Sequence, residues 1–598
     1  MASPTNTTGD NPESHELRRI TTVADKTTTT DPGPANIVDT STTHEAPPAT
    51  NEQDGGDEPH RPGTLHGFKL YSVAIGVCFG AFMMSLDISV ISTAIPSITS
   101  DFGSTSHIAW YPAAYTFATC ALTPLAGKLA AVFPLDRVYL GSSVVFLAGS
   151  VVCGAAPTSE AFIAGRAIAG AGAAGVASNG LTILVTIAPA RKKPLFMGMG
   201  AGCFAIGLVL APILGGAFTD RLTWRWCFWI NLPFVAVTIF VIFLFFRPAQ
   251  GRNTGQSIPA RLESLDLIGC AIFVPAIFML LLAMQRGGEQ DSWDSSRIVG
   301  LFAGGGVTMM IFVYWERRKG DAAMIPHSVV MRRTVVFAVL FAFCHMGSLT
   351  IAAYYLPEWF QAVQGVSPLT SGVRMLPTVI TQLITTVIAS GLAIRIRYYN
   401  PYFLLAPVSM GVSSGLYTTF TVSTTTTSHW LGFQIIQGIG SGLGMQMSSL
   451  AVQLELKDHP ELVPMGIAFV MFVQYLGATV LQVIAGTVFT NSLVHQLLGP
   501  AGLNSGQATL LLEAGTNSVR ETTEMYFPEL LQPVLEAYNT AITHVFFVPV
   551  AGACAAFLLA FGIKWNKLEG ASTSPLAKMR ARRSEKRQQQ ADLQSSQA

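Results

Sequence analysis

The sequence MGMGAGCFAIGLVLAPILGGAFT, from Met197 to Thr219, is long and apolar enough to cross a lipid bilayer as a single helix. It also contains a proline and many glycines, which weaken helices in water. In lipid, small residues let a neighbouring helix approach closely, and neighbours can satisfy the backbone group that the proline leaves unpaired. The stretch therefore predicts a kinked, closely packed membrane helix in a protein that changes shape.

The composition of the whole chain agrees with a membrane location. Of its 598 residues, 50% are hydrophobic and only 12% are charged, and the mean hydropathy is +0.44. Soluble domains carry about 25% charged residues, so this balance argues against a chain of soluble domains. The eight cysteines lie within apolar runs and show no metal-ligand spacing, which argues against a disulfide framework or a zinc site.

Fourteen apolar runs follow a polar N-terminal segment, and each is expected to form one membrane span. Segment 1–66 is rich in Thr, Pro, Asp and Glu and is expected to be a disordered tail. The sequence thus predicts an all-α polytopic membrane protein. The expected spans are 69–96, 108–127, 138–157, 161–188, 195–219, 226–246, 265–284, 298–315, 334–360, 369–393, 402–421, 429–453, 463–490 and 541–563.

The positions of lysine and arginine orient these spans. When the N-terminus is placed in the cytosol, most of the 36 basic residues fall in loops and tails on the cytosolic side. Both termini are therefore expected to be cytosolic, which requires an even number of spans.

An internal repeat divides the chain into two halves. The sequence RAIAGAGAAG from Arg166 matches QIIQGIGSGLG from Gln434, at an offset of 268 residues. The dipeptide Met-Gly recurs at the same offset, at the starts of the fifth and thirteenth spans. We expect a cytosolic tail at 1–66, a six-helix half at 67–246, loops with an inserted helix pair at 247–333, a second six-helix half at 334–563 with an outer loop at 491–540, and a basic tail at 564–598.

Several motifs resemble those of the major facilitator superfamily, and in particular of its fourteen-span drug:proton antiporters. They are LDISVISTAIPSI from Leu86, RAIAGAGAAG from Arg166, GLVLAPILGGAFTD from Gly207, QRGGEQDSW from Gln285 and YYLPEWFQAVQGVSPLTSGV from Tyr354. The chain looks most like the fungal toxin and multidrug efflux pumps of that branch, from about residue 70 to 565. This resemblance implies two six-helix halves around a central cavity, with two inserted helices.

Asp87 is an acidic residue inside the first span, where an ionised carboxylate costs about 2.5–3.5 kcal/mol on insertion scales. Taking up a proton would remove that charge. The resemblance implies the same role, because the family's first-helix aspartate matches Asp87. The alternative is an aspartate at a helix interface, satisfied by the hydroxyl groups of neighbouring serines.

Arg166, early in the fourth span, is the second ionic group in the membrane region of the first half. The arginine of the matching family motif is implicated in proton coupling, so the resemblance implies that Arg166 tunes Asp87. The glutamine of that motif is replaced here by Ala169. The alternative is a structural arginine that holds backbone carbonyls or pairs with Glu160.

Four residues of the opening stretch match the antiporter motif on the fifth helix of the family: Gly207, Pro212, Gly215 and Gly216. The motif separates exporters from importers among relatives, so the resemblance implies export. The alternative is that these residues only allow close packing.

A second family motif, in the loop after the second span, is degraded in this chain. Its acidic position is Ala131 and its glycine position is Pro134. The conformational latch that this loop provides in relatives therefore lacks its acidic group here.

Polar and aromatic side chains within the spans are candidates for a substrate cavity. They serve either as contacts between helices or as the lining of an amphipathic pocket, which suits bulky aromatic compounds. His345 is in addition a candidate proton relay. The candidate residues are Tyr111, Tyr115, His345, Tyr354, Gln437, Gln446, Phe472 and Gln474.

The sequence therefore predicts a secondary active transporter rather than an enzyme. Glycine patterns at 170–175 and 411–415 lack the strand context of nucleotide-binding or hydrolase motifs, and no Walker A sequence is present. We expect proton-coupled export of a hydrophobic or amphipathic small molecule, such as a fungal secondary metabolite, mycotoxin or drug. The expected partners are this substrate and the lipid bilayer, without a cofactor beyond the proton gradient, a nucleic acid or a required oligomer.

Two alternatives remain open. One is a vacuolar transporter of basic amino acids or siderophores on the same fold, and the other is a membrane receptor that does not transport. The plasma membrane is the expected location, with the vacuolar membrane as the alternative, because the sequence carries no recognised sorting signal.

Overall fold

The computed structural model shows a helical protein. It describes residues 67–102, 107, 110–189, 192–247, 261, 264–287, 291–396, 398–423, 425–514 and 519–565. All of them belong to one compact part of the chain, His60–Ala598. None of these residues lies in a β-strand, so the predicted all-α fold class is confirmed. The predicted tails, 1–66 and nearly all of 564–598, lie outside the described residues.

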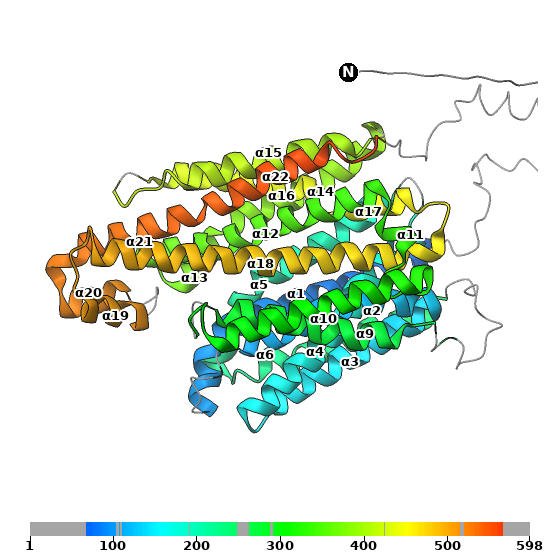
Figure 1. The fold of residues 1–598 in the computed structure, drawn as a ribbon, viewed down its shortest axis with the longest axis horizontal. Coiled ribbons are helices and arrows are strands. Elements are labelled where there is room, and N and C mark those ends of the chain that lie inside the picture. The colour runs from blue at the N-terminus through cyan, green and yellow to red at the C-terminus, as the bar shows by residue number, and fades with distance from the viewer. Residues whose placement is uncertain are drawn as a thin grey trace, which may run out of the picture. The chain divides into compact units, whose positions relative to one another are not determined.

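The first half is built around α4. It consists of α1 (Gly67–Phe102), α2 (Trp110–Val132), α3 (Leu135–Ala155), α4 (Ser159–Ile187), α5 (Lys193–Arg221), α6 (Trp226–Trp229) and α7 (Asn231–Phe245). α4 packs against α2 and α3, and α1 packs against α4, α5 and α7 (Figure 1). Of the most apolar 18 residues of α4, 83% are buried inside the protein. This share is the highest among the candidate membrane spans of the described residues.

The second half is built around α12 and α16. Its helices are α12 (Arg333–Ala362), α13 (Pro368–Arg374), α14 (Leu376–Ile396), α15 (Asn400–Tyr417), α16 (Thr427–Gly444), α17 (Met447–Glu455), α18 (Val463–Leu498), α19 (Ser505–Ala514), α20 (Val519–Tyr526), α21 (Leu531–Val545) and α22 (Phe547–Ala560). α16 packs against α14 and α15, while α12 packs against α18 and α22.

The inserted pair, α9 (Leu267–Arg286) and α10 (Ser296–Lys319), lies between the halves in the sequence, and α9 contacts α2 and α18. Asp291 holds the turn between the two helices. Its carboxylate accepts a hydrogen bond from Arg286 Nε at 2.9 Å and pairs with Arg297 at 3.4 Å. The hydrogen bond from Arg286 lowers the pKa of Asp291. Arg286 and Asp291 both belong to the QRGGEQDSW motif.

Eleven helical segments among the described residues are long and apolar enough to cross a membrane. The chain is therefore a multi-pass membrane protein. Three further expected spans, 108–127, 402–421 and 429–453, form α2, α15 and α16 with α17, but they fall outside that set. The count of fourteen spans stays a prediction.

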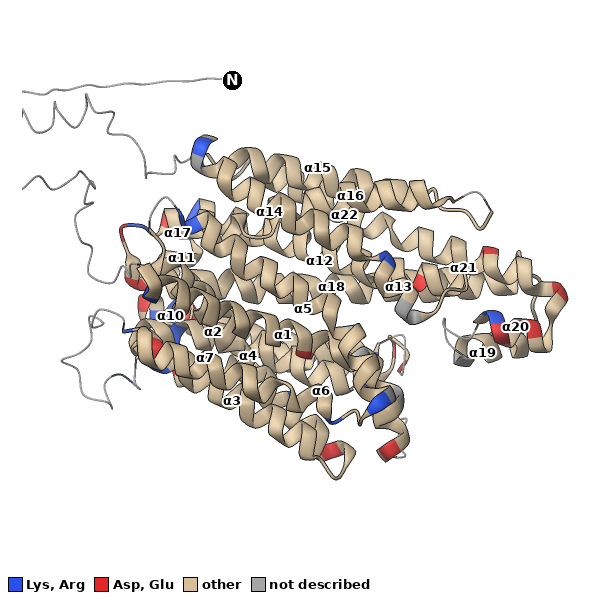
Figure 2. Cartoon of the chain, turned by 180° about the vertical axis from the view of Figure 1, so that it is seen from behind, with Lys and Arg blue, Asp and Glu red and all other residues tan. Residues whose placement is uncertain are grey.

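Charged residues lie mainly at the ends of the helices, as Figure 2 shows. Lys and Arg gather near α10, α17 and the short helix α11 (His327–Val330). We call this end, where α1 begins and α22 ends, the tail end, and the opposite end the far end. The positive-inside rule predicts that the tail end faces the cytosol.

The two halves meet in an apolar cluster at the tail end. Two hydrogen bonds also cross between the halves there: Ser390 Oγ donates to Pro194 O at 3.0 Å, and Gln453 Nε2 approaches Met197 Sδ at 3.4 Å. The far-end cluster around Trp359, by contrast, contains residues of the second half alone. The structure thus has its tail end closed. The cluster includes Leu181, Val185 and Met197 from the first half and Val335, Leu450 and Val470 from the second.

The sequence repeat corresponds to equivalent packing in the two halves. Gly172 of α4 contacts the backbone of Phe146 on α3, and Gly440 of α16, 268 residues later, contacts Met410 on α15. A Cβ atom at Gly440 would lie 2.6 Å from Met410 Cγ. Both helices also follow a threonine cap at the same offset, Thr158 and Thr426.

Substitution of the repeat glycines should destabilise the protein. We expect Gly172→Val and Gly440→Val each to lower the free energy of unfolding by about 1–3 kcal/mol, because a side chain must displace the backbone or side chain of the neighbouring helix. Thermal unfolding of the purified protein, followed by tryptophan fluorescence, measures this. Gly216→Ala is the control, since a Cβ at Gly216 meets nothing within 4 Å. Equal losses in all three variants would contradict the packing argument.

Candidate functional site

The two predicted ionic residues of the first half form a buried ion pair. Arg166 Nη1 donates to Asp87 Oδ2 at 2.5 Å, and the side chains are 1% and 0% exposed. The alternative pairing of Arg166 with Glu160 is wrong, since Glu160 is 74% exposed and lies 4.0 Å from His107. Because the pair joins α1 to α4, a change in the charge of Asp87 acts directly on the contact between these helices.

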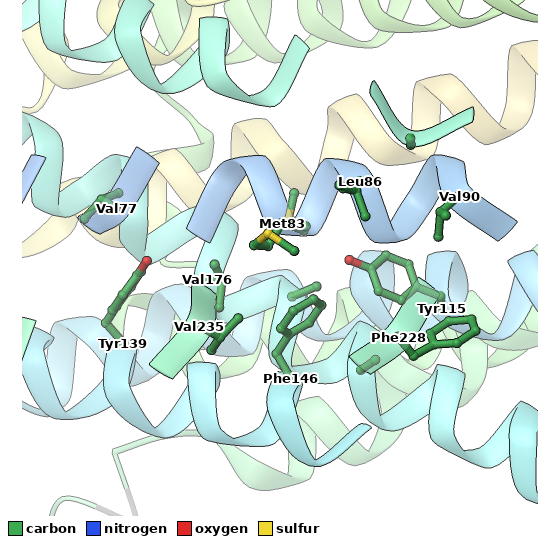
Figure 3. Packing of buried hydrophobic residues seen from close by; sticks show 14 of the residues in the cluster. Val77, Met83, Leu86, Val90, Tyr115, Tyr139, Phe146, Val176, Phe228 and Val235 are labelled. Carbon is green, nitrogen blue, oxygen red and sulfur yellow. The ribbon is translucent and has the colours of Figure 1, made fainter. Parts of the chain in front are cut away.

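Two residues of α2 contact Arg166. Arg166 Nε donates to the main-chain oxygen of Tyr111 at 3.0 Å, and its guanidinium lies 4.5 Å from the centre of the Tyr115 ring. Figure 3 shows Tyr115 and Phe228 beside the α1 segment that carries Leu86 and Val90. A cation over an aromatic face is stabilised further when water is excluded, so Arg166 is held in place independently of Asp87.

The second carboxylate oxygen of Asp87 is bound by Asn231, which the sequence reasoning missed. Asn231 Nδ2 lies 3.0 Å from Asp87 Oδ1 and 3.0 Å from Ser150 Oγ. Asn231 is fully buried at the start of α7, so it joins α1, α3 and α7 at one point. The apolar sequence WCFWINLP around Asn231 could have revealed it, because a single amide side chain in a membrane span often binds a neighbouring helix.

A line of polar groups extends from this site toward the far end. The Tyr111 hydroxyl lies 2.9 Å from Ser159 Oγ, which lies 2.9 Å from His107 Nδ1. His107 and Ser159 were not predicted. The line links the surface near His107 to the helix that carries the Tyr111 carbonyl.

The glycine stretch has two packing faces within one continuous helix, α5. Gly198 and Gly202 face α14 of the second half, where Cβ atoms would lie 2.8 Å from Ser390 Oγ and 3.0 Å from Leu383 Cδ2. Gly207 and Gly215 face α1, where Cβ atoms would lie 2.5 Å from Phe82 O and 2.9 Å from Val90 Cγ2. The predicted close packing is therefore present on both sides of α5.

The space around Gly216 differs. It lies about five turns beyond Gly198, on the same side of α5, yet it faces open space. α5 thus approaches the second half more closely near the tail end than at this glycine. The side chain of Pro212 lies outside the described ones.

The candidate cavity residues lie in separate environments. Tyr111 and Tyr115 border Arg166, and His345 stacks on Phe341 at 5.4 Å. Gln437 accepts a hydrogen bond from Ser413, and Phe472 packs on Phe273 of the inserted pair at 5.3 Å. Their role as substrate ligands stays a prediction. The remaining three differ in exposure: Tyr354 is 54% exposed, and Gln446 and Gln474 are half-buried.

No group of three metal-binding side chains occurs in the part of the chain that the structure describes. A groove of about 330 Å³ lies away from the ion pair, between the inserted pair and α18. Its lining includes Met284, Trp293, Phe302, Val483 and Thr487.

The family model of the Major Facilitator Superfamily matches residues 77–481. This range includes the ion pair, Asn231 and both packing faces of α5. The chain belongs to this superfamily. It is therefore a membrane transporter of small molecules rather than an enzyme.

Relatives of this transporter include three fungal proteins. It is 40% identical to the MFS-type transporter poxA of Penicillium oxalicum, over 84% of this chain and 90% of the relative. It is 41% identical to the efflux pump mlcE of Penicillium citrinum, over 84% and 92%. It is 38% identical to the MFS-type efflux pump MFS1 of Arthroderma benhamiae, over 86% and 94%. The resemblance to fungal efflux pumps is thus confirmed.

Solved structures support the fold of the transporter. A double tryptophan variant of XylE matches with a TM-score of 0.54 at 13% identity, over 86% of this chain and 98% of that structure. The human organic anion transporter MFSD10 matches with a TM-score of 0.51 at 13% identity, over 81% and 99%. At this identity the match concerns the fold alone.

Removing one partner of the ion pair should lower the free energy of unfolding more than removing both partners. We expect Asp87→Leu and Arg166→Met each to lower the free energy of unfolding by about 3–5 kcal/mol, because a charge is left buried without its partner. The double variant should recover most of this loss. Thermal unfolding of the four proteins gives the coupling energy of the pair.

A control pair includes a second aspartate of helix α1. Asp101 and Arg225 form an ion pair at 3.2 Å with side chains 50% and 32% exposed. Asp101→Leu should cost less than about 1 kcal/mol, because water screens the remaining charge. Additive losses for Asp87→Leu and Arg166→Met would show that the pair is not coupled in the folded protein.

Proposed function

We propose that this transporter exports a hydrophobic or amphipathic small molecule in exchange for protons. The class of compound is a fungal secondary metabolite, mycotoxin or drug. The observation that carries the proposal is the buried Asp87–Arg166 pair at the contact of α1 and α4, closed by Asn231. A carboxylate buried against a single arginine is a group whose protonation changes the contact between two helices.

The proposed coupling follows from the charges of the pair. Proton uptake by Asp87 removes its negative charge and weakens its attraction to Arg166. Arg166 keeps its hydrogen bond to the Tyr111 carbonyl and its contact with the Tyr115 ring. α1 is then free to shift against α4, and loss of the proton restores the pair. Proton binding is in this way linked to one of two helix arrangements.

The direction of transport is proposed from two supports. Relatives at 38% and 41% identity are named efflux pumps. Two of the glycines that match the antiporter motif, Gly207 and Gly215, also pack closely against α1, the helix that carries Asp87. We further propose the plasma membrane as the site of action, with both termini in the cytosol.

Transport by the full chain in vesicles tests the proposal. The purified protein is reconstituted into liposomes, and the efflux of a fluorescent amphipathic dye, rhodamine 6G, is followed with and without an imposed pH gradient. We expect gradient-dependent dye flux in the wild type and its loss in Asp87→Asn. Asp101→Asn, a neutralised aspartate on the same helix α1 with a half-exposed side chain, should retain the flux.

Two other outcomes would decide against the proposal. Gradient-driven uptake of arginine or a ferric siderophore, without dye flux, would favour the vacuolar carrier. No gradient-dependent flux of any of these probes, with identical behaviour in Asp87→Asn, would favour a receptor that does not transport.

A further inference from the structure

We propose that the inserted helix pair holds the tail end of the transporter closed, and that Lys128 is the residue that fastens it. We call Gly320–Arg332 the strap, because this segment leads from α10 to α12. The inference rests on the proposed transport function for its purpose, but its geometry and its test concern conformation alone.

Lys128 is a buried cation near the C-terminal end of α2. It is 5% exposed, and its Nζ donates to Ala323 O at 2.6 Å and to Ala322 O at 3.3 Å. A lysine is rarely buried unless it is paired, so these two carbonyls are a specific site for its ammonium group. The bond connects the first half to the strap.

Two carboxylates hold the acceptor carbonyls in position. Asp266 accepts hydrogen bonds from Trp315 Nε1 at 2.8 Å and from Met324 N at 3.2 Å. Glu316 accepts from Met324 N at 3.1 Å and from Ile325 N at 3.0 Å. Because Met324 is also buried in the apolar cluster of α2, α9 and α10, the turn before it is fixed against the inserted pair.

The same turn is joined to the second half. Asp321 Oδ1 accepts a hydrogen bond from Ser328 N at 2.9 Å at the start of α11. Arg332 Nη1 donates to Glu455 O, at the end of α17, at 2.9 Å. The strap therefore runs from the lysine of the first half to α17 of the second.

The fastening point lies at the seam between the halves. Gly127, next to Lys128, is in close contact with Ala468 of α18, and a Cβ atom there would lie 3.0 Å from Pro464 O. When the tail end opens, α2 and α18 must separate at this contact. If the strap stays with α17, the Lys128 ammonium loses its acceptors. If the strap moves with α2, the contact of Arg332 with Glu455 is lost. In both cases one end of the strap is released.

The strap also accounts for the degraded loop motif. The acidic position of that motif is Ala131, so this loop cannot supply its usual carboxylate. Lys128, three residues earlier, makes instead a contact to backbone carbonyls of the inserted segment. A backbone acceptor needs no particular side chain at 322 or 323, so this contact has no signature in the sequence.

Hydrogen–deuterium exchange of the full chain, without substrate or pH gradient, tests this inference. We expect Lys128→Met to accelerate exchange at the tail end by roughly tenfold to a hundredfold, the effect of losing hydrogen bonds from a charged donor. Far-end peptides should be unchanged. The tail-end peptides are 181–187, 193–200, 447–455 and 463–470, and the far-end references are 351–363 and 534–546.

Two controls and a second variant complete the experiment. Arg318→Met removes an exposed cation from the neighbouring turn of α10 and should change nothing. Lys128→Arg keeps a cationic donor and should restore slow exchange. Glu316→Gln leaves residue 128 unchanged and loosens the acceptor turn, because a single amide oxygen replaces two carboxylate oxygens. It should show the tail-end pattern more weakly.

Unchanged tail-end exchange in both Lys128→Met and Glu316→Gln would overturn the proposal. Acceleration at both ends of the helices would also overturn it, since it would mean that Lys128 stabilises the fold in general. The two proposals can fail separately. If the wild type moves no dye but Lys128→Met exchanges faster at the tail end alone, this inference holds and the proposed function is wrong.

Discussion

The ion pair of Asp87 and Arg166 is the interaction on which the first half depends. Both side chains have lost their water, which costs several kcal/mol per ion. Their contact with each other and with Asn231, Tyr111 and the Tyr115 ring offsets that cost. The pair therefore fixes α1 and α4 relative to each other as long as both charges are present. For the same reason, neutralising either partner would weaken the contact between α1 and α4.

The physics of the bilayer explains how much of the fold could be predicted. Backbone groups in lipid must be satisfied within a helix, so apolar runs gave the helices and their order. The residues Asp87 and Arg166 were also found, because charges in a span stand out. The contact between them could not be predicted, since the sequence offered Glu160 equally well as the partner of Arg166. Asn231 was missed because a lone amide in a span does not reveal which neighbour it binds.

The candidate cavity was harder to predict for a different reason. A sequence shows which polar side chains lie in a span, but not how each helix is rotated about its axis. Phe472 points to Phe273 of the inserted pair, whereas Tyr115 points to Arg166. The contacts of Lys128 were invisible for a related reason, since their acceptors are backbone carbonyls of residues nearly 200 positions away.

The repeat has a consequence for how such transporters diversify. α4 and α16 share their threonine caps and their glycine contacts, yet the position of Arg166 is occupied in the second copy by Gln434, which bonds to Thr378 at 3.0 Å. Among the described residues, the two copies thus share their packing, whereas the buried arginine occurs in the first copy only. Under the proposed function, mutations in the second half can alter its polar groups while the Asp87–Arg166 pair of the first half remains intact. Such a division would allow the two halves of one scaffold to change separately.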